Sequence, residues 1–198
     1  SLHPLYGDLS AAEQDRAIAP AAPGTRKVVL ATSIAETSLT IEGVRVVVDS
    51  GLARTARFSP ATGMSALVTS RVTQDAADQR AGRAGRVEPG VCLRLWHEGE
   101  ALLPGRRPEI LDADLAPFLL DLLAWGALPK EIPLLTQPSE ASVAQALHTL
   151  DILGALEQHE GRPRLSPHGK ELVRLPLHPR LAHMALLAGE HLPLAAAL

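Results

Sequence analysis

The feature that most limits the possible fold is a series of short apolar runs separated by segments of a different character. Residues 27–31, 44–48 and 90–96 are rich in valine and leucine, and each is short enough to be a buried parallel strand. Residues 8–18 have a helical composition and stop near a proline, which favours a helix end there. Alternation of strands and helices predicts an α/β layer fold for residues 1–96.

The pattern changes farther along the chain. Residues 54–70 predict a β-hairpin, because two arms flank a turn at residues 60–63. Beyond the hairpin, apolar residues recur at helical spacing. A short segment with a turn then follows, and helices followed by such a segment are typical of a winged helix. We expect three domains, spanning residues 1–98, 99–168 and 169–198, the last of them helical.

Composition excludes several classes of protein. Hydrophobic residues make up 46% of the 198 residues, which is enough for a packed core. No apolar run reaches about 18 residues and no signal peptide is visible, so a membrane span is not expected. Cys92 is the only cysteine, which excludes an internal disulfide and favours the cytoplasm. The net charge of −3 argues against a simple nucleic-acid coat protein, although arginines outnumber acids between Val44 and Arg86.

The strongest chemical signal is the octet 79–86, which reads Gln-Arg-Ala-Gly-Arg-Ala-Gly-Arg. Glycine lets the backbone approach a ligand closely, and the planar arginine fork matches phosphate oxygens. If a helix runs through Arg80, then Arg83 and Arg86 lie at or beyond its end on one side. The octet therefore predicts a pair of arginines directed at phosphate. The alternative is a surface turn with solvated arginines.

A second signal lies in residues 31–41, directly after the first apolar run. The carboxyl ends of parallel strands form the sheet edge at which open α/β folds bind ligands. Ser33 and Glu36 have capping-box spacing, so a short helix is expected to begin here. Its free N–H groups and hydroxyls suit a nucleic-acid phosphate. On the residues alone, a capped helix without a ligand is the simpler explanation.

These segments carry a family resemblance. The octet resembles motif VI of superfamily 2 helicases, and residues 31–41 look like motif V of the DEAH-box group. The order of the motifs and the hairpin between them also resemble the DEAH-box group, and the sequence of residues 175–184 looks most like the bacterial HrpB-type branch. The resemblance implies a second RecA-like domain, with a parallel sheet, helices and a β-hairpin. A winged-helix domain and the start of a helical ratchet domain would follow it.

The resemblance also implies roles for single residues. Gln79 would position the water that attacks ATP, and Arg83 and Arg86 would be arginine fingers. Arg80, the first arginine of the octet, would pack or pair locally and take no catalytic part. Nucleic-acid contacts are implied at Gly7, Thr32 and Ser33. Nucleotide contacts are implied at Ile18, Ser38 and Glu42.

ATP and Mg²⁺ are the implied cofactors, but the chain has neither a Gly-x-x-x-x-Gly-Lys-Ser/Thr loop nor an Asp-Glu-x-His sequence. Both belong to a first RecA-like domain. We therefore expect a fragment of a longer protein, inactive alone, whose partners are that domain and single-stranded nucleic acid, RNA rather than DNA. No membrane partner and no metal site of its own are expected. The alternative function is a non-catalytic adaptor that binds nucleic acid or protein.

Overall fold

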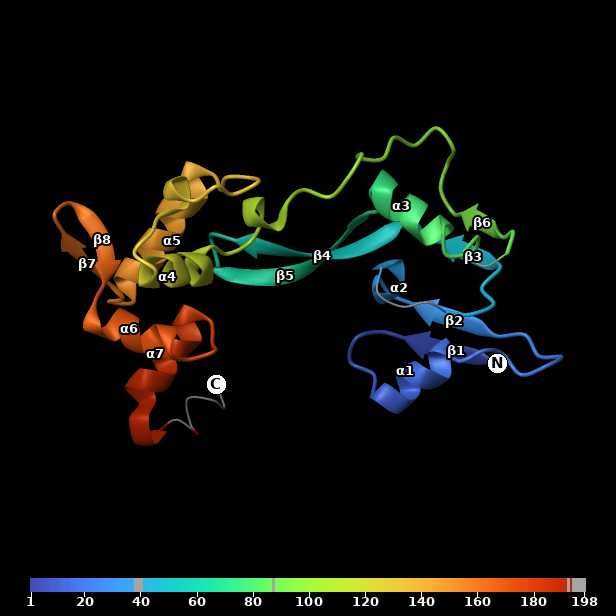
Figure 1. Cartoon of the computed structure of the whole chain (residues 1–198), viewed down its shortest axis with the longest axis horizontal. Helices are drawn as coiled ribbons and strands as arrows, with labels where there is room; N and C mark the ends of the chain where they lie inside the picture. The colour runs from blue at the N-terminus through green and yellow to red at the C-terminus, as the bar shows by residue number, and fades with distance from the viewer. Residues whose placement is uncertain (38–40, 87, 192, 194–198) are drawn as a thin grey trace. The chain divides into compact units, whose positions relative to one another are not determined.

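The computed structural model describes residues 1–37, 41–86, 88–191 and 193, and it contains two compact units (Figure 1). The first unit comprises Ser1–Thr55 and Leu67–Arg106, and the second comprises Ala56–Ala66 and Arg107–Leu198. Among the described residues, no helix is both long enough and apolar enough to cross a membrane.

The first unit alternates strands and helices, as the apolar runs predict. Its elements are β1 (Leu2–Leu5), α1 (Ala11–Ile18), β2 (Val28–Ala31), α2 (Ile34–Thr37), β3 (Val46–Asp49), α3 (Gln74–Ala81) and β6 (Val91–Arg94). Strand β1 pairs with β2, and β3 pairs with β6, both in parallel. The register sets Leu2 against Val28 and Val46 against Val91. Parallel pairing between strands that flank helices confirms the α/β prediction.

Helix α1 begins later than the helical composition of residues 8–18 suggests. The Ser10 backbone N–H donates to Glu13 Oε2 at 3.0 Å, and the Ser10 hydroxyl donates to the same oxygen at 2.6 Å. These bonds fix Ser10 as the residue before the helix. They also lower the pKa of the Glu13 carboxyl below its ordinary value.

The prediction that the apolar runs are buried is wrong for alternate side chains of each strand. Six of them are between 51% and 60% exposed: Val28, Leu30, Val46, Val48, Val91 and Leu93. A parallel sheet buries its strands only where layers cover both of its faces. The described residues leave one face of each strand pair open to solvent. Cys92, between the exposed Val91 and Leu93 of β6, is half-buried.

The hairpin prediction is confirmed. Strand β4 (Leu52–Ser59) pairs with β5 (Met64–Arg71). At the turn, the Gly63 N–H donates to the Ser59 carbonyl at 2.8 Å. Gly63 has a φ of 63°, a conformation that glycine adopts without a Cβ penalty. The base of the hairpin belongs to the first unit and its tip to the second.

The second unit consists of helices and one small antiparallel sheet. Its elements are η1 (Glu109–Leu111), α4 (Ala116–Ala124), η2 (Pro129–Glu131), α5 (Glu140–Ile152), β7 (Leu156–His159), β8 (Arg162–Leu165), α6 (Pro167–Val173), α7 (Pro179–Ala188) and η3 (Gly189–His191). Strands β7 and β8 form the antiparallel pair. The core lies between α4, α5, α6 and α7, where Leu119, Leu150, Leu172 and Ala182 are fully buried.

Local capping explains where the helices of the second unit begin and end. The Ser139 hydroxyl accepts the Ser142 N–H at 3.0 Å and starts α5, while Gly154, with a φ of 66°, follows its end. The apolar periodicity beginning at Ile110 is interrupted, because Ile110 lies in η1 and α4 starts later. Asp114 Oδ1 accepts the Ala116 N–H at 2.9 Å and marks that start.

Candidate functional site

The predicted arginine segment begins in α3 and continues into the turns that follow it. Gln79 lies exposed in the last turn of α3, which ends at Ala81. The Arg83 N–H donates to the Arg80 carbonyl at 3.1 Å, so the chain turns back at once. Arg83 is half-buried there, and Arg86 is exposed. All three predicted catalytic residues therefore lie at the carboxyl end of one helix.

Arg80, which the resemblance set apart as a locally paired residue, has that role in the structure. Its Nε and Nη2 donate to Glu36 Oε1 at 2.9 and 2.6 Å. Its Nη1 donates to Asp49 Oδ1 at 2.7 Å and to the Leu52 carbonyl at 3.1 Å. Burial opposes the charge on Arg80, but the hydrogen bonds that it donates to both carboxylates outweigh this effect and raise its pKa above the ordinary value. Arg80 is thus a structural link between α2, β3 and α3.

The same contacts bring the two sequence motifs together. Arg83 Nη2 donates to the backbone carbonyl of Glu36, and Arg106 Nη2 donates to Glu36 Oε2. Glu36 therefore accepts hydrogen bonds from three arginine side chains. The capping-box spacing of Ser33 and Glu36 did not predict this pairing. No signal within residues 31–41 could have revealed it, because every partner lies more than 40 residues away, at separations of 44, 47 and 70.

Helix α2 follows the strand edge at which ligand contacts were predicted. The Thr32 N–H donates to the Leu5 carbonyl at 3.1 Å, which ties this edge to β1. The Glu36 N–H donates to the Ser33 carbonyl at 3.0 Å and forms the first helical turn. Thr32 and Ser33 are exposed, so their side chains are accessible to a ligand.

The other predicted contact residues are spread over the first unit. Gly7 is exposed, and a Cβ built on it would meet no atom within 4 Å. Ile18 is half-buried at the end of α1, and Glu42 is exposed before β3. Ser38 lies outside the described residues. No described contact joins Gly7, Ile18 or Glu42 to the arginine segment.

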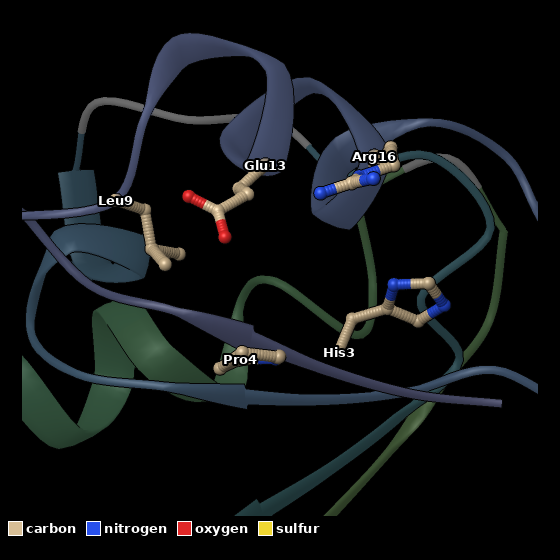
Figure 2. A pocket seen from close by; sticks show the side chains of 5 residues that line it. All are labelled: His3, Pro4, Leu9, Glu13 and Arg16. Atoms are coloured by element: carbon tan, nitrogen blue, oxygen red, sulfur yellow. The ribbon is translucent and has the colours of Figure 1, made fainter.

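A shallow hollow lies between β1 and α1 (Figure 2). Its volume is about 270 Å³, and it is lined by His3, Pro4, Leu9, Glu13 and Arg16. None of the predicted contact residues lines it, so the hollow is distinct from the motif segments. Among the described residues, no group of three or more His, Cys, Asp or Glu side chains is placed to hold a metal ion.

Comparison with known proteins gives consistent matches. Residues 1–88 match the family model described as the helicase conserved C-terminal domain. The chain is 49% identical to the ATP-dependent RNA helicase HrpB of Escherichia coli, over 94% of this chain and 23% of that protein. It is 38% identical to human ATP-dependent RNA helicase DHX33, over 93% of this chain and 27% of that protein.

Solved structures agree with these matches. Two crystal structures of Escherichia coli HrpB match with TM-scores of 0.84 and 0.87, both at 49% identity. They cover 95% and 93% of this chain, and 23% and 24% of the solved chains. The chain spans only about a quarter of the length of HrpB and DHX33. The motif segments, the α/β fold and these similarities lead to one conclusion: over nearly its whole length, the chain is similar to DEAH-box helicases of the HrpB-like branch.

Proposed function

We propose that this chain is the C-terminal helicase portion of an ATP-dependent RNA helicase and supplies the arginine fingers of its ATPase site. The observation that carries this proposal is the arrangement at the end of α3. Gln79 and Arg86 are exposed there, and Arg83 is held at the adjoining turn against the Glu36 carbonyl. Arg80 is already occupied by two carboxylates, so it serves the structure and leaves phosphate to its neighbours.

The residues present fit the phosphate end of ATP better than its metal. Guanidinium groups present rigid forks of N–H donors that suit phosphoryl oxygens. Mg²⁺ prefers oxygen ligands such as carboxylates, and the described residues contain no cluster suited to a metal. When bound, ATP and Mg²⁺ supply the phosphoryl group and its charge neutralisation, and we assign the metal to a first RecA-like domain of the longer protein.

In this reading each side chain has a defined task. Arg83 and Arg86 stabilise the negative charge that grows on phosphoryl oxygens during transfer. Gln79 orients the attacking water through its amide. Ile18, Ser38 and Glu42 contact the nucleotide. A chain with these groups alone has nothing on which to act, so we expect no useful ATP hydrolysis without the first RecA-like domain.

The nucleic-acid surface is proposed to lie at Gly7, Thr32 and Ser33. Contacts from backbone groups and small hydroxyls reach phosphate and sugar, so they discriminate little between sequences. RNA is favoured over DNA because the matched relatives are named RNA helicases. We assign the complete protein to the cytoplasm.

A winged-helix domain is proposed over residues 99–168 and the start of a helical ratchet domain over residues 169–198; the second unit contains both from Arg107 onward. Helices α4 and α5 followed by the β7–β8 pair support the first assignment. Helices α6 and α7, which pack on the same core, support the second. Residues 1–98 would then be the second RecA-like domain.

The test is ATP hydrolysis by the full-length protein, with and without single-stranded RNA, for the wild type and Arg83→Ala. We expect RNA to stimulate the wild type and the substitution to lower the rate by about 10³-fold or more, the usual value of an arginine finger. Binding of a non-hydrolysable ATP analogue should persist.

Arg45→Ala is the matched control, because the Arg45 side chain is 69% exposed and pairs with the exposed Glu88. It removes the same charge and should retain the wild-type rate. An inactive wild type, or an Arg83→Ala variant with full activity, would instead favour the adaptor.

A further inference from the structure

A buried ionic cluster joins the segment after β2 to the segment around the end of α3. It contains the carboxylates of Glu36 and Asp49 and the guanidinium groups of Arg80 and Arg106. The Glu36 and Asp49 side chains are only 5% and 1% exposed. Burying charge is costly unless every group is paired, so the cluster fixes the positions of its members closely.

Arg80 is committed to this cluster. Four of its five N–H donors are used, two on Glu36, one on Asp49 and one on the Leu52 carbonyl. Rotating the guanidinium toward any other ligand would leave two buried carboxylates without their shared cation. Arg80 therefore acts as a fixed anchor for the Glu36 side chain.

Glu36 links this anchor to one of the arginine fingers. Its carboxylate is held by Arg80 and Arg106, while its backbone carbonyl accepts a hydrogen bond from Arg83. The place of the Arg83 guanidinium thus depends on the place of the Glu36 backbone.

Glu36 is also bonded to the proposed nucleic-acid segment. Its N–H donates to the Ser33 carbonyl at 3.0 Å, and the Ala35 N–H donates to the Thr32 carbonyl at 3.3 Å. A continuous line of contacts therefore runs from Ser33, through the Glu36 backbone, to Arg83.

We propose that Glu36 is a positioning residue that holds Arg83 in place for phosphoryl transfer and couples it to nucleic acid bound at residues 32–33. This inference rests on the proposed function, because it needs Arg83 to act as a finger. Glu36 itself does not touch the reacting atoms in this scheme. Its effect on the rate passes through Arg83, and that makes the inference testable.

The experiment measures single-turnover ATP hydrolysis by the full-length protein at saturating single-stranded RNA. Glu36→Gln removes the charge that holds Arg80 and Arg106 and keeps the size of the side chain. A misplacement of about 1 Å can cost on the order of 10²-fold in rate, so we expect a loss between about 10-fold and 100-fold. The KM for ATP should stay near the wild-type value, because a transition-state contact is affected.

Three further variants separate positioning from damage to the fold. Glu88→Gln makes the same chemical change at an exposed pair, where the Glu88 side chain is 43% exposed, and should leave the rate unchanged. Arg106→Gln removes the half-exposed partner of the same carboxylate, 49% exposed, and should lower the rate in the same direction as Glu36→Gln. Arg83→Ala combined with Glu36→Gln should be no slower than Arg83→Ala alone.

The outcomes are distinct. Non-additive losses in Glu36→Gln and Arg83→Ala, with a normal KM, support the inference. Full activity in Glu36→Gln, or losses that multiply in the double variant, overturn it while the proposed function stands. If Glu36→Gln fails to fold by thermal melting, Arg106→Gln decides in its place. A wild type without RNA-stimulated hydrolysis overturns the proposed function itself.

Discussion

Replacing Arg80 by glutamine should destabilise the protein more than any loss of a surface charge. The substitution removes the cation shared by Glu36 and Asp49. Asp49 would keep only the Gly51 N–H on Oδ1, at 3.0 Å, and its Oδ2 already lacks a hydrogen-bond partner among the described residues. Glu36 would keep Arg106, whose side chain is half-exposed.

These contacts set the expected loss in the free energy of unfolding. Removing one partner of a buried ion pair costs about 3–5 kcal/mol, because an uncompensated charge stays buried. The Arg80 side chain is 16% exposed and Arg106 remains on Glu36, so we expect the lower end, about 3 kcal/mol. That is a large share of a stability that is typically about 5–15 kcal/mol.

The assay is urea unfolding of the 198-residue chain at neutral pH, followed by circular dichroism. Arg45→Gln is the matched control, because it breaks an exposed pair with Glu88, and such pairs contribute about 0.2–1 kcal/mol. Equal midpoint shifts in the two variants would refute the reasoning. They would mean that the cluster around Arg80 is as well solvated as the surface pair.

Three other changes test separate parts of the fold. Leu119→Ala empties a fully buried position in α4 and should cost about 2–5 kcal/mol in urea unfolding. Gly169→Ala should lower the melting temperature, because the new Cβ would collide with the Ala155 carbonyl. This is expected although alanine favours helices more than glycine does. A raised melting temperature would contradict the contact. Hydrogen bonding from Arg71 lowers the pKa of Glu100 below its ordinary 4.5. The Arg71–Glu100 pair therefore stabilises the fold fully above pH 4.5, and it stabilises the fold less as the pH falls. The difference in melting temperature between the wild type and Glu100→Gln should shrink in acid. A difference that does not change with pH would mean that the pair is absent.

Much of the local structure could be predicted because its causes are local. The turn at residues 60–63 was predictable because Gly63 accepts the positive φ that the turn requires. Helix α5 ends shortly before Gly154, which again has a positive φ. The apolar run at 27–31 became a strand, Val28–Ala31, with nearly the predicted bounds.

Other features depend on partners that no local pattern identifies. The runs at 27–31 and 44–48 look alike, yet they lie in separate two-stranded sheets, β2 beside β1 and β3 beside β6. The exposure of Val28 and Val46 likewise depends on whether other segments cover the strand faces. The domain boundaries, the winged helix and the assigned contact residues stay predictions.

The family resemblance and the candidate chemistry could be read from the sequence, because the residues of each motif stand next to one another along the chain. Which partner each arginine binds, in contrast, depends on the tertiary structure. Arg80 and Arg83 are three positions apart and chemically identical, but Arg80 donates to two buried carboxylates, whereas Arg83 donates to the Glu36 backbone carbonyl. Glu36 acquires its place between them through contacts 44 and 47 residues away. Folding sets those distances, and a linear pattern does not contain them.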